Sequence, residues 1–176
     1  MKTDSCRDAL YNRRSIRRFA NESISDSDVE EIIWAGLQAP SAGNLQPWRI
    51  VVVRDKARME KLAQAAFNQG FVAKGDLVLA VIAIPSESAV RYKERGSGLY
   101  VIQDTAALTY ALLLATHCKG LGACWVGAFD ESLAAKALNL PTGYRPVSLI
   151  PIGMPAEHPK SRGRKKLGEV VVKECF

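Results

Sequence analysis

The chain has 176 residues, of which 48% are hydrophobic and 24% are charged. This length predicts a single domain over residues 1–176 that buries roughly two thirds of its unfolded surface. The net charge of +6 is concentrated in Arg13–Arg18 and Lys160–Lys166. No stacking aromatics alternate with these cations, and no helix-turn-helix or zinc-finger spacing is present, so nucleic-acid binding is not expected.

The sequence also argues against a secreted protein, a membrane protein and a metalloprotein. It has no charged amino-terminal segment leading into an apolar run and a cleavage site, so no signal peptide is expected. Its most apolar strand-like run, Leu77–Ile84, is too short to cross a bilayer. The four cysteines form no C-x-x-C pair and no metal-ligand spacing with His117 or His158. We therefore expect a cytoplasmic protein with reduced thiols and no bound metal.

In chain order, the first half is predicted to contain helices and strands around two polar segments. A short helix over Asp4–Tyr11 is followed by a second helix that begins at the N-cap Ser25 and ends before Pro40. The later elements are predicted as a strand over Arg49–Val53, a helix over Lys56–Asn68 and a central strand over Asp76–Ile84. The near-continuous apolar character of the last strand predicts that both of its faces are covered.

The second half is predicted to begin with a polar loop, Pro85–Gly98, that shapes a substrate entrance. The longest helix follows over Leu99–Lys119, and its apolar residues lie nearly all round it, which predicts a buried helix. The remaining predictions are a strand over Ala123–Phe129, a helix over Glu131–Leu138, a strand over Val147–Ile152 and strand character over Glu169–Lys173. The last segment is a candidate to pair with the sheet edge of a partner chain.

Two segments carry the functional groups that are most informative. The first is Arg13-Arg14-Ser15-Ile16-Arg17-Arg18-Phe19, whose guanidinium groups and hydroxyl suit phosphate oxygens. Its apolar residues Ile16 and Phe19 are expected to tie it to a core. The second is the loop Pro40-Ser41-Ala42-Gly43-Asn44-Leu45-Gln46-Pro47-Trp48. Its two amides, Asn44 and Gln46, can read the mixed donor–acceptor edge of a heterocycle.

Together with two further segments, these motifs resemble the nitroreductase family of FMN-dependent oxidoreductases. The further segments are Gly120-Leu121-Gly122-Ala123-Cys124-Trp125-Val126-Gly127-Ala128-Phe129 and Gly153-Met154-Pro155-Ala156-Glu157. The resemblance implies an α+β fold with a mostly antiparallel central sheet flanked by helices. It also implies a homodimer with FMN at the subunit interface and a carboxyl-terminal tail that pairs with the partner subunit.

The resemblance further implies roles for individual residues. Arg13 and Ser15 would bind the FMN phosphate from one side, and Arg162 and Arg164, with Lys165 as an alternative, from the tail. Arg17 would support the reduced flavin electrostatically at its N1 and O2 edge. A solvated basic run remains the alternative for the tail, and Arg14 would contact the ribityl chain or turn outward. The flavin ring and ribityl chain would be lined by Pro40, Ser41, Ala42, Asn44, Gln46, Asn68, Gln69, Gly127 and Ala128.

The implied enzyme takes hydride from NADH or NADPH by a ping-pong mechanism and reduces nitroaromatics, quinones or similar small acceptors. The flavin would carry the hydride, so no side chain is assigned a catalytic role beyond the support from Arg17. The sequence has no G-x-G-x-x-G fingerprint, so the nicotinamide donor would bind only transiently. Two alternatives stay open: a reductive dehalogenase-like or flavin-cleaving member of the superfamily, and a non-catalytic FMN sensor or storage protein.

Overall fold

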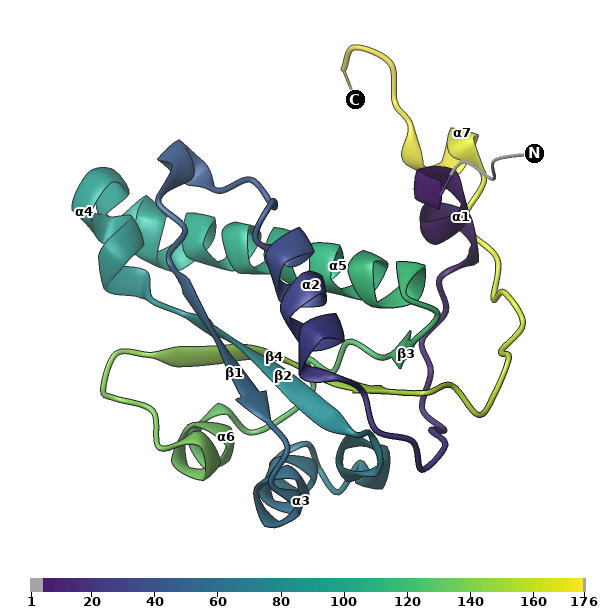
Figure 1. Cartoon of the computed structure of the whole chain (residues 1–176). Coiled ribbons are helices and arrows are strands. Elements are labelled where there is room, and N and C mark those ends of the chain that lie inside the picture. The colour runs from purple at the N-terminus through teal and green to yellow at the C-terminus, as the bar shows by residue number, and fades with distance from the viewer. Residues whose placement is uncertain (1–4, 176) are drawn as a thin grey trace.

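The computed structural model describes residues 5–175, with side chains from Arg7 onward. Its centre is one antiparallel sheet with the strand order β1-β2-β4-β3. Helices cover both faces of this sheet, with α2 and α5 on one side and α3 and α6 on the other (Figure 1). The predicted α+β architecture is therefore confirmed. The strands are β1 (Trp48–Val53), β2 (Leu77–Ala83), β3 (Gly122–Ala123) and β4 (Arg145–Gly153).

The central strand β2 supplies both halves of the core. All seven of its residues are buried, as the apolar run predicted. Because side chains alternate along a strand, Leu77, Leu79 and Val81 pack with α2 and α5, whereas Val78 and Ala80 pack with α3 and α6. One strand thus holds the two helical layers together.

The helix boundaries follow from capping side chains. The Ser25 hydroxyl accepts from the Asp28 N–H at 3.1 Å and begins α2 (Asp26–Gly36), as predicted. Asp55 caps α3 (Lys56–Ala65) and Asp130 caps α6 (Glu131–Leu138) in the same way. Asn139 ends α6 in the left-handed region at φ 52°. The first helix, α1, spans Ser5–Asn12; its predicted start, Asp4, lies outside the described residues.

The prediction of a polar loop over Pro85–Gly98 is wrong, because most of this segment forms helix α4 (Pro85–Arg95). Pro85 occupies the first turn, where its missing N–H costs nothing, and Glu87 follows in that turn. A π-helical turn, Gly96–Tyr100, then leads into α5 (Val101–Cys118). The polarity of the segment reflects an exposed helix face and not a loop.

Three other predicted boundaries are also wrong. Helix α3 ends at Ala65, before the predicted Asn68, because Phe67 and Asn68 adopt positive φ and lead into the 3-10 turn Gly70–Lys74. The strand predicted over Ala123–Phe129 shrinks to Gly122–Ala123, followed by one bridge between Val126 and Leu149.

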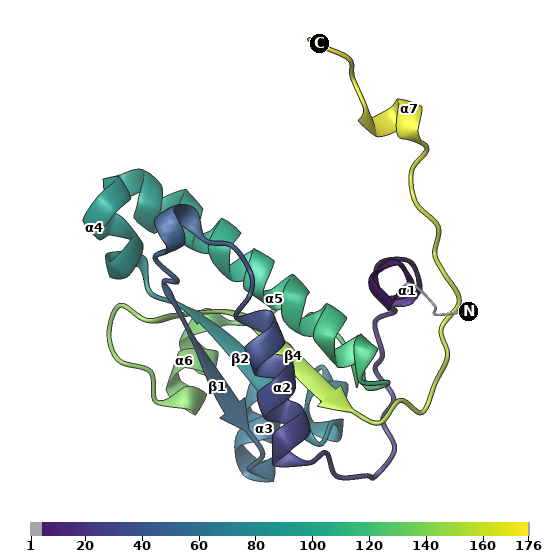
Figure 2. The ribbon, with the colours of Figure 1, turned by 45° about the horizontal axis from the view of Figure 1, so that its top comes forward.

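The strand predicted over Glu169–Lys173 is replaced by the single helical turn α7 (Leu167–Val170). Figures 1 and 2 both show this tail extending away from the sheet, and within residues 5–175 it pairs with no strand.

Helix α5 is buried on one face only, which corrects the expectation of burial all round. Its inward residues, including Leu108 and Leu112, pack on the sheet and α2, whereas Tyr110 on the other face is 40% exposed. By length and mean hydropathy, the helical stretch Pro85–Cys118 could cross a membrane. We assign α5 to the core, because its buried face packs against β2, β4 and α2.

A buried hydroxyl pair joins α5 to β4. Thr109 Oγ1 donates to the Thr105 carbonyl at 2.8 Å, so the Ser148 hydroxyl must donate to Thr109 Oγ1 at 2.9 Å. The variant Thr109→Val should lower the free energy of unfolding by about 1–3 kcal/mol, because it leaves the Ser148 donor buried and unpaired. Urea unfolding measures this change. The double variant Thr109→Val/Ser148→Ala should recover most of the loss, and a double variant as unstable as the single one would contradict this account.

Candidate cofactor site

The arginine segment is fastened across the edge of the sheet. The Ile16 N–H donates to the Ala123 carbonyl at 2.9 Å, and the Ala20 N–H donates to the Met154 carbonyl at 2.9 Å. Ile16 is 8% exposed and packs against Gly122, where an added Cβ would lie 2.8 Å from the Ile16 side chain. Phe19 similarly covers Gly153. The prediction that Ile16 and Phe19 tie this segment to the core is confirmed.

Glu157 links the arginine segment to the carboxyl-terminal segment. Its Oε1 atom accepts from the backbone N–H of Arg17 at 2.6 Å and of Arg18 at 3.1 Å. These contacts join residues about 140 positions apart in the chain. Sequence reasoning quoted Glu157 only as part of a motif and gave it no role. The available signal was a lone acid at the start of a basic tail.

The two basic segments line one cavity of about 300 Å³, which we call the basic cleft. It unites the predicted phosphate ligands Arg13 and Ser15 with Arg162 and Arg164, which come from opposite ends of the sequence. Lys160 lines the cleft, whereas Lys165 is not among its described lining residues. The lining residues are Arg13, Arg14, Ser15, Arg17, Glu157, Pro159, Lys160, Ser161, Arg162 and Arg164. Cations therefore outnumber the single lining carboxylate, as binding of a dianion requires.

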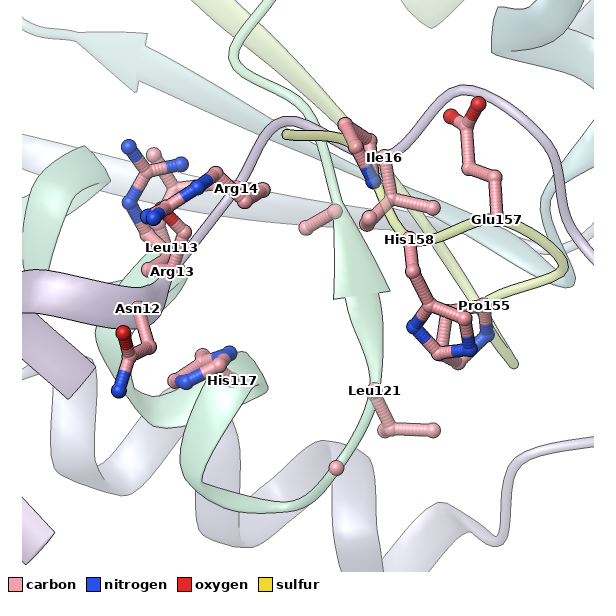
Figure 3. Close-up of a pocket in the computed structure, with 13 residues that line it drawn as sticks. Asn12, Arg13, Arg14, Ile16, Leu113, His117, Leu121, Pro155, Glu157 and His158 are labelled. Carbon is pink, nitrogen blue, oxygen red and sulfur yellow. The ribbon is translucent and has the colours of Figure 1, made fainter. Parts of the chain in front are cut away.

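A second cavity of about 350 Å³ adjoins the basic cleft and shares Arg13, Arg14, Glu157 and Pro159 with it. Figure 3 shows His117 entering from the end of α5 and His158 from the carboxyl-terminal segment. The Arg14 guanidinium also donates to the Tyr11 carbonyl at 2.8 Å, so it faces α1 as well as the cleft. The remaining walls are largely apolar: Ile16, Leu113, Leu121 and Pro155.

A second group of predicted residues gathers beside Arg17. The Gln69 Nε2 donates to the Ala128 carbonyl at 3.2 Å, which brings the Asn68–Gln69 turn to the Gly127–Ala128 segment. The Arg17 guanidinium lies 5.6 Å from the ring centroid of Phe71, in the turn that follows. A Cβ built on Gly127 would meet no described atom closer than 3.7 Å, so the backbone there is open to a ligand.

Cys124 lies among these groups, and the sequence predicted only a buried or unreactive reduced thiol at this position. It is 1% exposed. Burial raises the pKa of its thiol, while the nearby Arg17 guanidinium acts in the opposite direction. The thiol is therefore held neutral next to the cationic cleft.

The third predicted group is the loop Pro40–Gln46, which is shaped by backbone turns. Gly43, Asn44 and Gln46 all have φ between 51° and 58°. The Ala42 N–H donates to Asp104 Oδ1 at 2.9 Å, and Asp104, in the first turn of α5, is 6% exposed. Sequence reasoning missed Asp104, although an acid inside an otherwise apolar helix is a recognisable signal.

One chain does not bring this loop to the basic cleft. The loop is fastened at Asp104, near the start of α5, while the cavity beside the cleft includes His117, near its end. Thirteen helical residues at 1.5 Å each separate these two positions by roughly 20 Å. In Figures 1 and 2, the segment before β1 lies at the α4 end of α5, whereas α1 and β3 lie at its other end. The predicted site residues therefore form two sites at opposite ends of one helix.

Comparison with known proteins assigns the fold and the sequence motifs to one family. The model of the nitroreductase family matches residues 10–154. The chain belongs to the nitroreductase family. As such it is an oxidoreductase, and the resemblance read from its motifs is confirmed.

Three relatives show how far the similarity extends. The chain is 34% identical, over 88% of its length and 87% of the relative's, to an Archaeoglobus fulgidus protein provisionally named NADH dehydrogenase/NAD(P)H nitroreductase. The structure of NfrA2 from B. megaterium matches with a TM-score of 0.91 and 25% identity, over 99% of this chain and 76% of that one. A Vibrio harveyi NADPH:FMN oxidoreductase complexed with NAD+ matches with a TM-score of 0.89 and 26% identity, over 98% and 78% of the two chains.

The burial of Asp104 predicts a pH dependence of stability. Burial raises the pKa of this carboxyl, although its bond from Ala42 opposes the shift. Because the folded state then holds the proton more tightly than the unfolded state, stability falls as the pH rises from the unfolded-state pKa of Asp104 to its raised folded-state pKa, and the cost stays constant above that. The stability difference between Asp104→Asn and wild type should shift in favour of the variant between pH 4 and pH 8. Urea unfolding across this range measures it, and a pH-independent difference would contradict the assignment.

Proposed function

We propose that this chain is an FMN-dependent oxidoreductase that takes hydride from NADH or NADPH and reduces nitroaromatics, quinones or similar small acceptors by a ping-pong mechanism. The observation that carries the proposal is the basic cleft, where Arg13 and Ser15 meet Arg162 and Arg164. Membership of the nitroreductase family and the similarity to an NADPH:FMN oxidoreductase support the choice of cofactor.

The donor groups of the basic cleft fit a phosphomonoester. A phosphomonoester carries close to two negative charges at neutral pH, and the arginine forks and the Ser15 hydroxyl offer several donors to its oxygens. Glu157 does not oppose such an anion strongly, because its Oε1 atom already accepts from the Arg17 and Arg18 backbone. We propose Arg13, Ser15, Arg162 and Arg164 as the phosphate ligands and Lys160 in the place given to Lys165.

The residues beyond the phosphate would bind and tune the flavin ring. When bound, FMN supplies the chemistry of accepting and passing on a hydride. Arg17 reaches from the cleft toward Phe71 and would place positive charge beside the ring. The Gly127–Ala128 backbone and the Asn68–Gln69 turn would contact the ring edge, since they lie together and the turn leads into Phe71, which Arg17 contacts. Arg14 would hold the ribityl chain.

The separation of the two half-sites supports a homodimer with FMN at the subunit interface. The loop Pro40–Gln46 of one chain would complete the site around the basic cleft of its partner, since within one chain α5 holds them apart. The half-exposed face of α5 around Tyr110 offers an apolar surface for this contact. The exposed tail, including Val171 and Val172, would pair with an edge strand of the partner subunit. We place this dimer in the cytoplasm, where free Cys118 and Cys175 stay reduced.

The first test of the proposal is an absorbance spectrum of the protein incubated with FMN. Wild type should retain flavin bands that bleach anaerobically with NADH or NADPH. Arg13→Ala should weaken FMN binding by about 10- to 150-fold, because it removes a charge-assisted contact worth roughly 1.5–3 kcal/mol.

Arg18→Ala is the matched control, because it removes the same charge from the same segment but from a side chain outside the cleft's described lining. Equal flavin loss in both variants would contradict the phosphate assignment. Bound flavin that neither donor bleaches would instead favour a sensor or storage protein.

Mixed dimers test whether the site is shared between subunits. Arg13→Ala damages the cleft half of a site, and Gln46→Glu damages the loop half. If each site combines both subunits, a dimer with one variant of each kind contains one fully damaged site and one wild-type site. Mixing and reannealing the two variants should therefore restore about one tightly bound FMN per mixed dimer. No recovery in isolated mixed dimers would show that each site lies within one chain.

A further inference from the structure

Helix α4 carries polar side chains over the loop proposed to line the flavin. A Cβ built on Gly43 would lie 2.7 Å from the Tyr92 hydroxyl and 2.9 Å from the Arg91 Nη1. These two side chains therefore reach the tip of the Pro40–Gln46 loop. Because Gly43 has no side chain, it leaves space for the side chains of Tyr92 and Arg91.

This end of α4 has a surplus of positive charge. Arg91, Lys93 and Arg95 are all exposed, and none of them belongs to an ion pair found within the described part of the chain. Of the two acids on α4, Glu87 is paired with Arg49 at 2.7 Å. Glu94 forms no ion pair among the described residues and offsets one of the three cations. The surplus can therefore attract an anion.

Aromatic rings hold the two arginines, Arg91 and Arg95, in place without neutralising them. Tyr92 and Tyr100 pack edge to face with centroids 5.0 Å apart. The Arg91 guanidinium lies 5.5 Å from the Tyr92 ring, and that of Arg95 lies 5.3 Å from the Tyr100 ring. Arg95 Nε also donates to the Tyr100 hydroxyl at 3.0 Å. A guanidinium positioned by a ring keeps its charge and further N–H donors for a ligand.

The chain needs such a group to recognise its nicotinamide donor, because it has no glycine-rich phosphate loop. NADPH differs from NADH by one phosphomonoester on its adenosine, which carries close to two negative charges. The adenosine lies at the far end of the dinucleotide from the nicotinamide, so its contacts belong at the margin of the flavin site. A basic cluster with two partly exposed rings suits both the phosphate and the adenine base.

We propose that Arg91, Lys93 and Arg95, with Tyr92 and Tyr100, bind the phosphorylated adenosine of NADPH and make the chain prefer NADPH to NADH. This inference rests on the proposed function, since it assigns the donor of the same site. It makes these residues determinants of specificity and gives them no part in hydride transfer.

The test compares Arg91→Gln/Lys93→Gln with wild type in the holoenzyme. The ratio of kcat/KM for NADPH to that for NADH should exceed one in wild type and fall by at least about tenfold in the variant, the size of one lost charge-assisted contact. The loss should lie mainly in KM, and NADH should change by less than about twofold. The control Lys61→Gln/Lys136→Gln removes the same charge from exposed residues beside a separate cavity and should leave the ratio unchanged.

Calorimetric titration with NADP+ and NAD+ gives a readout that does not depend on turnover. NADP+ should bind more tightly than NAD+ to wild type, and the α4 variant should lose this difference. An equal loss for both nucleotides, or no wild-type preference, would overturn the inference and leave the proposed function intact. Failure to bind FMN would overturn the proposed function instead. The NADP+ titration would still show whether the α4 residues bind the nucleotide's phosphate.

Discussion

The site depends on the fastening of the arginine segment to the carboxyl-terminal segment. Several guanidinium groups with no anion between them repel one another, so their convergence has to be held by contacts elsewhere. The backbone bonds of Ile16 and Ala20 to Ala123 and Met154 supply part of that hold. Glu157 adds to that hold, because its carboxylate accepts two backbone N–H groups and places one negative charge among the cations. The ordered cleft is thus prepared for an anion before one binds.

Helix α5 contributes its inner face to the core, and its length separates two groups of predicted site residues. Its inner face, with Leu108 and Leu112, packs against the sheet, and this requirement fixes the helix across the molecule. Its two ends then carry different groups, the loop proposed to line the flavin at Asp104 and the cavity beside the basic cleft at His117. A rigid helix cannot shorten this distance, so the proposed FMN site would need a second chain to bring the two groups together.

Unsatisfied polar atoms collect at the loop end of α5. Among the described residues, the buried side-chain atoms without a hydrogen-bond partner are Asp104 Oδ2 and Ser88 Oγ. Ser88 lies in α4, the helix whose Arg91 and Tyr92 cover the loop. Buried unpaired groups cost stability and are uncommon in regions whose only task is packing. Their position agrees with the proposal that α4 and the loop form the margin of a binding site.

The sequence by itself determined the local features that depend on neighbours in the chain. Ser25 as an N-cap, the apolar run of β2 and the helix over Glu131–Leu138 follow from capping and periodicity, and the ordered motifs identified the family. Only the tertiary structure decided which distant groups meet: Lys160 in place of Lys165 in the cleft, Glu157 under the arginine segment and Asp104 under the loop. It also decided that Pro85–Arg95 is a helix, because exposed polar residues form loops and solvent-facing helices equally well until packing selects one. Contacts between positions about 140 residues apart leave no periodic trace in the chain, so the fold alone brings them together.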